Sequence, residues 1–329
     1  MSPDKVRDVT YSAEQWKLES PFRITGHVFH LIEMLHVKIT ENGSEGHGEA
    51  AGVYYLDETG DSILADAEAV KEAIELGADR ETLRQLLPAG GARNAIDCAL
   101  WDLEAKLSGK SIWDMTGIAP QMTQSFFTVG IDTPEKMAAK ALSLDSSKLK
   151  VKLDGKIPFE CISAVRGARP DAEIIVDVNQ GWTFAQLVEL APKFRELNIS
   201  MIEQPLPRGG DQDLEGYDSP VPLCADESCL TTEEFEQAAR RYQVINIKLD
   251  KTGGLTEALD LARMARSHGK DLMIGNMVGT SLGMAPGYVI AQLCKFVDLD
   301  GTLYLNGDRE HPMTFEQGFM SRPESILWG

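Results

Sequence analysis

The stretch IIVDVNQGW, residues 174–182, begins with a run of β-branched and apolar side chains and ends with polar and glycine residues, and this pattern recurs along the chain. Similar short apolar runs, alternating with stretches of helical spacing, are found at 126–129, 149–153, 200–203, 222–226, 244–249, 272–276 and 296–300. A single strand–helix unit cannot bury its own apolar face, whereas eight of them close into a parallel barrel surrounded by helices. The sequence therefore predicts an α/β fold of the TIM-barrel type.

A different pattern precedes the barrel. Residues 27–50 alternate apolar and polar side chains around Asn42-Gly43, a pair suited to a hairpin turn. Residues 61–107 then show helical spacing, which Gly109 ends. After about residue 302 the apolar pattern is too weak for another strand–helix unit. We therefore expect three parts, which are an N-terminal α+β capping domain at 1–118, a modified TIM barrel, (β/α)7β, as the catalytic domain at 119–305, and a C-terminal segment at 306–329 that returns to the cap.

Composition excludes several classes of partner. The 329-residue chain is 43% hydrophobic, which suffices for a packed core. Its formal charge of -19 opposes approach to phosphate backbones or anionic membranes, so we expect no nucleic-acid or membrane partner. No run approaches the roughly 20 apolar residues of a membrane-spanning helix, and the first residues lack the apolar core of a signal peptide. The five cysteines form no Cys-x-x-Cys pair. These features indicate a cytoplasmic protein with buried thiols.

Ionisable and amide side chains gather at the predicted strand ends, where the loops of a parallel barrel build one shared mouth. They are Lys150, Lys152, Asp177, Asn179, Glu203, Asp226, Lys248, Asp250, Asp298 and Asp300. Three carboxylates on consecutive strands, Asp177, Glu203 and Asp226, would repel one another without a cation between them. Because oxygen-only ligation suits a hard ion, the sequence predicts a Mg²⁺ site.

Two lysines flank this predicted metal site. Lys152 and Lys248 end the second and sixth strands, which lie on opposite sides of an eight-stranded barrel. A lysine must be neutral to act as a base, and Lys150 together with a divalent cation disfavours the charged form of Lys152. One lysine would remove the α-proton of a carboxylate substrate, and the cation would stabilise the enediolate. Reprotonation by the other lysine would invert the centre.

At these residues the chain resembles the enolase superfamily, in its muconate-lactonizing-enzyme subgroup. The matching motifs are Lys150-Val-Lys152, Asp177-Val-Asn179, Glu203-Gln-Pro205, Ala225-Asp226-Glu227-Ser228, NIKLDKTGG (246–254) and ARNAIDCALWDLEAK (92–106). The resemblance implies one Mg²⁺ per subunit and catalytic roles for the lysines, with Lys150 tuning Lys152. It also implies supporting positions around the metal for Asn179, Glu227 and Asp250.

Residues at the end of the eighth predicted strand narrow the activity expected within this subgroup. Asp298-Leu-Asp300 is similar to the signature with which dipeptide epimerases, including L-Ala-D/L-Glu epimerases, hold the free α-ammonium of the substrate, as charge-assisted hydrogen bonds would. The family's specificity loops correspond to 22–28 and 52–58 of the capping domain, with Arg23, His27 and Tyr54 as substrate-binding candidates. In epimerases for acidic dipeptides an arginine of the first loop meets the glutamate side chain. Here Arg23 is offset and His27 lies nearer the expected place, so the preferred side chain stays open.

Two other functions remain as alternatives. N-acylamino-acid racemisation or o-succinylbenzoate synthesis would use the same metal and lysines on substrates that have no ammonium group. More distantly, Gly279-Thr-Ser281-Leu-Gly283 fits the nucleophile elbow of serine hydrolases, although it follows the seventh strand instead of an early central one. The main expectation is a homo-oligomeric isomerase that acts on a small dipeptide.

Overall fold

The computed structural model describes residues 5–24 and 27–329. The chain begins with a three-stranded antiparallel sheet formed by β1 (Asp8–Ile24), β2 (His27–Glu41) and β3 (Ser44–Ala51). Asn42 and Gly43 make the β2–β3 turn with φ of 49° and 80°, as the sequence predicted. The long strand β1 was not predicted, because its many charged and polar residues hide the alternation that sheet pairing requires.

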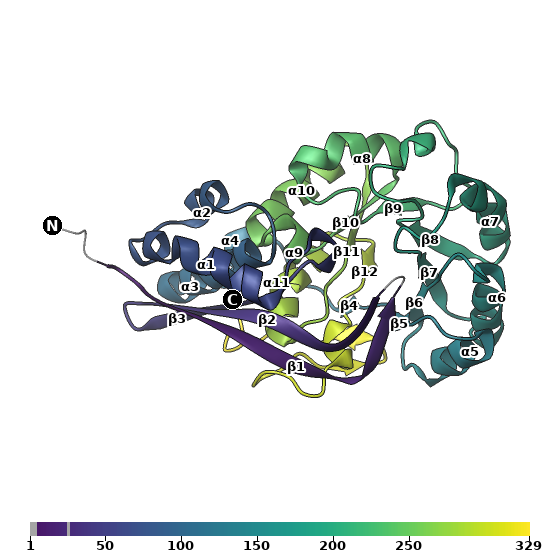
Figure 1. Cartoon of the computed structure of the whole chain (residues 1–329). Coiled ribbons are helices and arrows are strands. Elements are labelled where there is room, and N and C mark those ends of the chain that lie inside the picture. The colour runs from purple at the N-terminus through teal and green to yellow at the C-terminus, as the bar shows by residue number, and fades with distance from the viewer. Residues whose placement is uncertain (1–4, 25–26) are drawn as a thin grey trace.

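Helices cover one face of this sheet. They are α1 (Gly60–Glu75) and α3 (Gly91–Ser108), and the 3-10 turn η1 (Tyr54–Leu56) precedes them. The shorter helices α2 (Arg80–Leu86) and α4 (Ile112–Thr116) pack against α3. Helix α3 packs directly on β3 because glycines of that strand leave room for it. A Cβ at Gly48 would lie 2.0 Å from the carbonyl oxygen of Ala95. Gly109 ends α3 in the left-handed conformation, as predicted. These elements form the α+β part of the fold (Figure 1).

Eight parallel strands form the second part, in the sequential order expected for a barrel. They are β5 (Phe127–Val129), β6 (Lys148–Lys152), β7 (Glu173–Asp177), β8 (Ile199–Glu203), β9 (Leu223–Ala225), β10 (Val244–Ile247), β11 (Asp271–Ile274) and β12 (Phe296–Val297). A hydrogen bond of 2.7 Å from the Phe126 amide to the Val297 carbonyl joins the first strand to the last. The eight predicted strands are therefore confirmed.

Helices pack around the outside of these strands (Figure 1). They are α5 (Pro134–Ser143), α6 (Pro158–Ala168), α7 (Phe184–Glu196), α8 (Phe235–Arg241), α9 (Leu249–Thr252), α10 (Leu255–Ser267) and α11 (Ser281–Ala291). The helical stretch expected between β8 and β9 was wrong. Residues 204–222, all of them described, contain only the 3-10 turn η2 (Gln212–Leu214), because their prolines and glycines interrupt helical hydrogen bonding.

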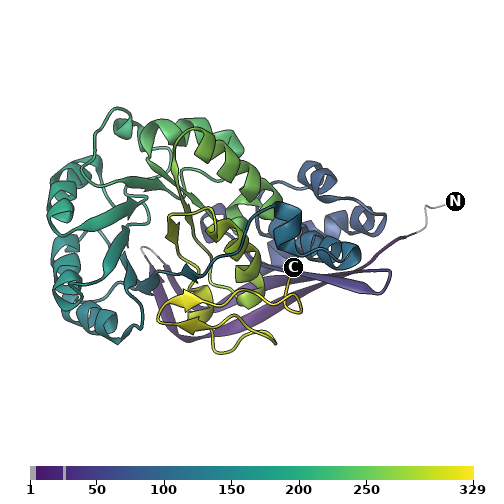
Figure 2. The ribbon, with the colours of Figure 1, turned by 180° about the vertical axis from the view of Figure 1, so that it is seen from behind.

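The C-terminal residues run back along the molecule to the helices of the first part (Figure 2). Trp328 donates its indole N–H to the Cys98 carbonyl at 2.9 Å, and the Gly329 amide donates to Asp102 Oδ1 at 2.7 Å. Short elements complete the chain, namely β4 (Thr123–Gln124), η3 (Thr232–Glu234), η4 (Gly301–Tyr304), β13 (Phe315–Glu316) and β14 (Phe319–Met320). The hydrogen bonds of Trp328 and Gly329 tie the end of the chain to α3.

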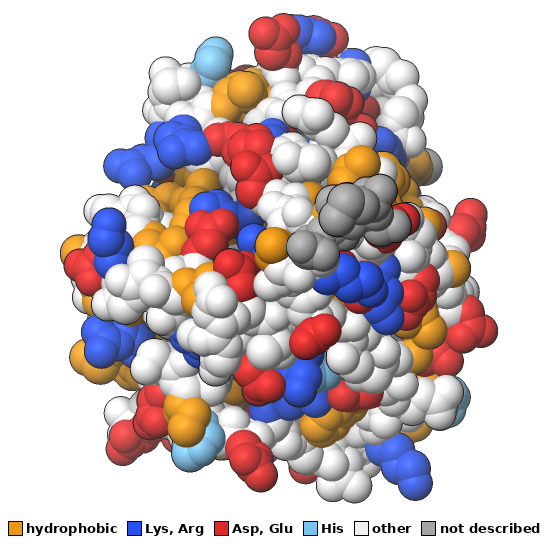
Figure 3. All heavy atoms as spheres, turned by 90° about the vertical axis from the view of Figure 1, so that its left-hand side faces the viewer, with side chains coloured by type: hydrophobic (Ala, Val, Ile, Leu, Met, Phe, Trp, Pro, Cys, Tyr) orange, Lys and Arg blue, Asp and Glu red, His pale blue; other side chains and the backbone are white. Residues whose placement is uncertain are grey.

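The surface carries both signs of charge. Acidic and basic side chains are interspersed over the face in Figure 3. No helix within the described ranges is long and apolar enough to cross a membrane.

Candidate active site

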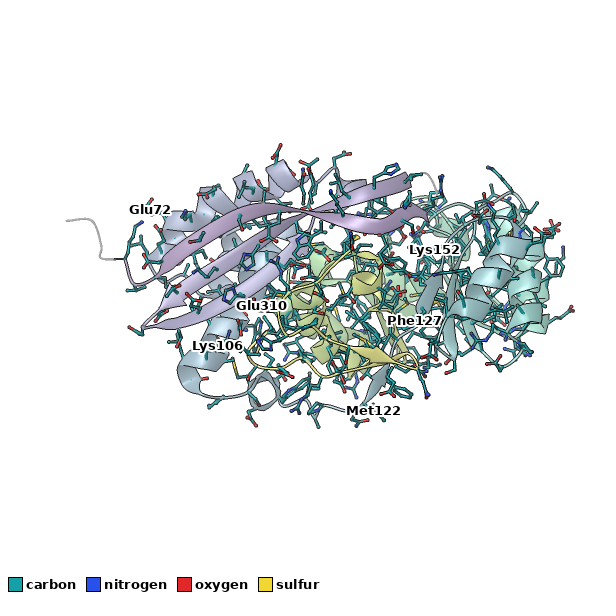
Figure 4. The ribbon with its side chains drawn as sticks, turned by 90° about the horizontal axis from the view of Figure 1, so that it is seen from below. Glu72, Lys106, Met122, Phe127, Lys152 and Glu310 are labelled. Atoms are coloured by element: carbon teal, nitrogen blue, oxygen red, sulfur yellow. The ribbon has the colours of Figure 1, made fainter. Side chains whose placement is uncertain are left out.

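The carboxyl ends of β6, β7 and β8 place ionisable side chains side by side. The parallel ladders pair Lys152 with Asp177 and Asp177 with Glu203, and Asp226 directly follows β9. Residues paired across a parallel sheet project their side chains to the same face. Figure 4 shows Lys152 at the end of the barrel that lies beneath the β1–β2 pair. The three predicted metal ligands are brought together and are fully buried.

Each of the three carboxylates is paired with at least one lysine ammonium group. Lysines that line the cavity make short ion pairs with them, which are Lys152 Nζ to Asp177 Oδ2 at 2.6 Å, Lys150 Nζ to Glu203 Oε2 at 2.8 Å, and Lys248 Nζ to Asp226 Oδ2 at 2.6 Å. Within the described residues, no three acidic, histidine or cysteine side chains are close enough together to hold a metal as they stand. The lysines supply the positive charge that buried carboxylates need. Carboxylate oxygens on neighbouring strands, each directed at a cation, are nevertheless the donor set of a hard divalent ion, and the residues fit Mg²⁺.

Lys150, Lys152 and Lys248 line a single cavity of about 300 Å³ at the barrel mouth. Lys152 belongs to the second barrel strand and Lys248 follows the sixth, so the two approach the cavity from opposite sides. This placement is the one that a two-base inversion requires.

Carboxylates favour the charged forms of Lys150 and Lys248 by raising the pKa of each. Burial alone would lower the pKa of Lys248, but Asp226 and Glu203 raise it well above its usual range. Burial would raise the pKa of Asp177, but the three lysines, with Lys152 first, lower it to about 2. Lys152, predicted to be neutral because of neighbouring cations, lies beside a carboxylate, with its Nζ 2.6 Å from Asp177 Oδ2. A lysine becomes available as a base where a metal ion shares the negative charge of the carboxylates.

Asp298 and Asp300 lie on the same cavity wall after β12. Asp298 Oδ2 accepts from Lys150 Nζ at 2.7 Å, whereas its buried Oδ1 has no hydrogen-bond partner among the described residues. Asp300 Oδ2 accepts from the Thr128 amide and from the Tyr304 hydroxyl, both at 2.7 Å. Burial, together with Asp298, raises the pKa of Asp300 to about 7. A buried carboxylate oxygen without a donor is suited to a ligand that brings one.

The loop at 52–58 covers the cavity. Tyr54 lines it and packs edge-on against Phe29 and Tyr55, at ring-centroid distances of 5.6 and 5.1 Å. Glu58 anchors the loop, because its carboxylate accepts from the Val53 amide at 2.8 Å and from the Gly91 amide, at the start of α3, at 3.2 Å. The loop is therefore held between the barrel mouth and α3.

The first predicted loop is described only in part. Arg23, at the end of β1, is exposed and is not among the residues that line the cavity. The side chain of His27 lies outside the described residues. Both substrate-binding assignments stay predictions.

The three predicted supporting residues occupy different places. Asn179 Oδ1 accepts from Lys152 Nζ at 3.1 Å and lines the cavity. Glu227 is buried beside Asp226, and neither of its carboxylate oxygens has a partner in the described part of the chain. Asp250 points away from the cavity and accepts from Asn94 of α3 at 3.2 Å. Asp250 thus connects the barrel to the cap.

Two residues of the site were missed from the sequence. Asn246 donates to Glu203 Oε1 at 2.6 Å, and Lys251 donates to Asp226 Oδ1 at 2.7 Å. Asn246 precedes Lys248 by two residues and so shares its strand face, a signal that the quoted 246–254 run already contained. Lys251 follows in α9, where strand alternation no longer applies.

The geometry around Ser281 does not support a nucleophile. Ser281 is fully buried at the start of α11, where its hydroxyl donates to Asp308 at 2.6 Å and accepts from the Met313 amide at 2.9 Å. It lies outside the cavity lining, and neither hydroxyl contact is to a histidine. Ser281 instead fastens the C-terminal segment to α11.

Comparisons with known proteins agree with this geometry. Residues 6–117 match the family model for the mandelate racemase / muconate lactonizing enzyme N-terminal domain, and residues 134–326 match the enolase C-terminal domain-like model. Among curated proteins, the chain is 42% identical over 305 residues to an N-acetyl-D-glutamate racemase of Pseudoalteromonas sp, covering 90% of this chain and 95% of the relative. It is 40% identical over 317 residues to the L-Ala-D/L-Glu epimerase of Escherichia coli (strain K12), covering 95% and 99%.

Solved structures share this fold over nearly the whole chain. An enolase family member from Agrobacterium tumefaciens with homology to dipeptide epimerases, solved with sodium and L-Ala-L-Glu, has a TM-score of 0.95 at 38% identity, covering 98% of this chain and 100% of its own. A dipeptide epimerase from Methylococcus capsulatus, complexed with Mg and L-Arg-D-Lys, has a TM-score of 0.91 at 31% identity, covering 97% and 98%.

Proposed function

Because this chain belongs to the mandelate racemase / muconate lactonizing enzyme family of the enolase superfamily, we propose that it is a dipeptide epimerase that inverts the α-carbon of the C-terminal residue. Asp177, Glu203 and Asp226 hold Mg²⁺, the cofactor of this reaction. Mg²⁺ supplies, when bound, a Lewis acid for the substrate carboxylate. This assignment gives the three carboxylates and the two lysines at the barrel mouth a chemical task.

The two lysines exchange protons with opposite faces of the α-carbon. A neutral amine, Lys152 for one epimer, accepts the α-proton, and the C–H electron pair passes into the carboxylate as an enediolate. The ammonium of Lys248 then donates its proton to the other face, which gives the opposite configuration. The lysines swap roles for the reverse reaction. No atom is lost or gained, so the reaction needs no further reactant.

The observation that carries the dipeptide assignment is Asp298 Oδ1, for which the described part of the chain supplies no hydrogen-bond donor. It is buried on the cavity wall, beside Asp300 and on the same side as Lys150. The free ammonium of a dipeptide brings the donors that this oxygen lacks, and charge-assisted hydrogen bonds of this kind are strong. An N-acyl group brings no positive charge to the two aspartates.

N-acetylglutamate racemisation is the second candidate, because one of the curated relatives carries that activity at 42% identity. The test is a substrate screen in D2O with Mg²⁺ that reads deuterium at the α-carbon by mass spectrometry. It compares free dipeptides having acidic, hydrophobic or cationic second residues with N-acetyl and N-succinyl amino acids. Exchange of dipeptides at a much higher kcat/KM supports the proposal. Preferential exchange of an N-acyl substrate contradicts it.

We also propose an oligomeric state and a cellular location for this protein. We expect a cytoplasmic homo-oligomer that binds one Mg²⁺ per subunit. Sedimentation equilibrium of the purified chain distinguishes an oligomer from a monomer.

A further inference from the structure

Lys251 is a buried lysine that the proposed proton transfers do not use. It lies in the single turn of α9, three residues after Lys248, and its side chain has 0% exposure. Four oxygens lie within hydrogen-bonding distance of its ammonium, which are Asp226 Oδ1 at 2.7 Å, the Asp226 carbonyl at 2.7 Å, the Asn246 carbonyl at 2.8 Å and the Cys229 carbonyl at 3.2 Å, so its three N–H donors are all satisfied. It therefore joins the segment after β9 to the end of β10.

These contacts fix the orientation of Asp226. Its amide donates to Gln204 Oε1 at 2.9 Å, and its carbonyl and Oδ1 both accept from Lys251. Only Oδ2 is directed to the barrel mouth, where Lys248 Nζ lies 2.6 Å away. The two carboxylate oxygens of Asp226 thus have separate partners, one behind the site and one in it.

A second proposed ligand depends on the same ammonium. Lys251 holds the backbone of Asn246, and the side chain of Asn246 donates to Glu203 Oε1 at 2.6 Å. The other oxygen of Glu203 is directed to Lys150 at 2.8 Å. One buried cation therefore supports the orientation of two carboxylates on adjacent strands.

We infer that Lys251 is a positioning residue for the metal site, which holds Asp226 directly and Glu203 through Asn246 so that each presents a single oxygen to the cation. This inference rests on the proposed assignment of both carboxylates as metal ligands. Outer partners of ligating side chains commonly determine ligand orientation, and their loss costs about 10-fold to 100-fold in metal affinity.

When Lys251 is replaced, the direction in which the Kd for a divalent cation changes distinguishes a positioning role from a simple effect of charge. Lys251 is positive, so removing its charge alone would strengthen the binding of a divalent cation nearby by relieving repulsion. Loss of orientation has the opposite effect. The direction of the change in Kd therefore tests the inference.

The experiment measures Mn²⁺ binding to the intact protein by isothermal titration calorimetry and electron paramagnetic resonance, without substrate. Lys251→Met is expected to raise the Kd for Mn²⁺ by about 10-fold to 100-fold. Lys270→Met is the matched control, because Lys270 also donates to backbone carbonyls of the barrel, those of Ala239 and Tyr242, but contacts no proposed ligand. Its Kd should match that of the wild type, and circular dichroism verifies that each variant is folded.

An unchanged or lower Kd in folded Lys251→Met overturns the inference. If that variant does not fold, Lys251→Gln, which keeps an amide donor for the carbonyls but has no charge, takes its place with the same expected and contradicting results. Wild-type protein and Asp226→Asn test the metal site separately. Wild-type binding that Asp226→Asn leaves unchanged would refute the proposed ligand set itself, whereas loss of binding in Asp226→Asn with unchanged binding in Lys251→Met refutes only the role of Lys251.

Discussion

Replacing Asp298 by Asn tests how the substrate is recognised. The change keeps the size of the side chain and removes the negative charge of a carboxylate whose Oδ1 has no hydrogen-bond partner among the residues that the structure describes. A hydrogen bond to a charged group contributes about 1.5–3 kcal/mol. Since each 1.36 kcal/mol is tenfold in rate, kcat/KM for a free dipeptide should fall by about 10-fold to 150-fold from this contact alone.

The substitution also disturbs Lys150, which lies 2.7 Å from Asp298 Oδ2. The assay therefore compares L-Ala-L-Glu with N-acetyl-L-glutamate in the same variant. Both substrates share the disturbance at Lys150, but only the dipeptide has an ammonium to lose. The ratio of the two kcat/KM values should shift toward the N-acetyl substrate by about 10-fold to 150-fold, the range that follows from the same contact energy. An equal loss for both substrates would refute the ammonium role of Asp298.

Three further outcomes follow from the described contacts. Burial raises the pKa of Asp97 from 3.8 to about 6, so the folded state binds the proton of this carboxyl more tightly than the unfolded state does. The contribution of Asp97 to the free energy of unfolding therefore falls as pH rises from about 4 to about 6. Asp97→Asn, in denaturant titrations at several pH values, should remove up to about 3 kcal/mol of this pH dependence, and an unchanged slope would show that Asp97 titrates normally. Gly90→Ala places a Cβ 2.2 Å from Glu58 Oε1 at a φ of 152°, and should lower the free energy of unfolding by about 1–3 kcal/mol. The loss should exceed that of the control Gly117→Ala, where the added Cβ meets no atom within 4 Å. Chelation by EDTA should abolish epimerisation and added Mg²⁺ should restore it in the wild type but not in Asp177→Asn. Circular dichroism of the reaction mixture measures the epimerisation. Activity that persists after chelation would argue against a metal enzyme.

The barrel was predictable because its strands are short and buried on both sides. In the run 174–178 every residue except Asp177 is apolar, and Asp177 lies at the barrel mouth. The position of the strand and the position of the site are therefore predicted together. The ordered set of Lys152, Asp177, Glu203 and Lys248 then followed from strand ends alone.

Other features depend on contacts that the linear pattern does not display. Strand β1 is rich in charged residues because one face of its sheet is exposed, and its pairing with β2 is decided by neighbours distant in sequence. The 204–222 connection was expected to contain a helix, but its prolines and glycines prevent one. Lys251 was overlooked because a lysine in a turn is ordinarily a surface charge, and only the fold shows the four oxygens around it.

The division of labour between Lys152 and Lys248 is the central claim, and α-proton exchange in the single variants Lys152→Ala and Lys248→Ala tests it most directly. Each variant is incubated in D2O with Mg²⁺ and with each epimer of the dipeptide, and mass spectrometry and proton magnetic resonance follow deuterium incorporation and configuration. We predict that neither variant epimerises the substrate and that each exchanges the α-proton of only one epimer, the opposite one in the two variants. Epimerisation at the wild-type rate by either variant would contradict the two-base account.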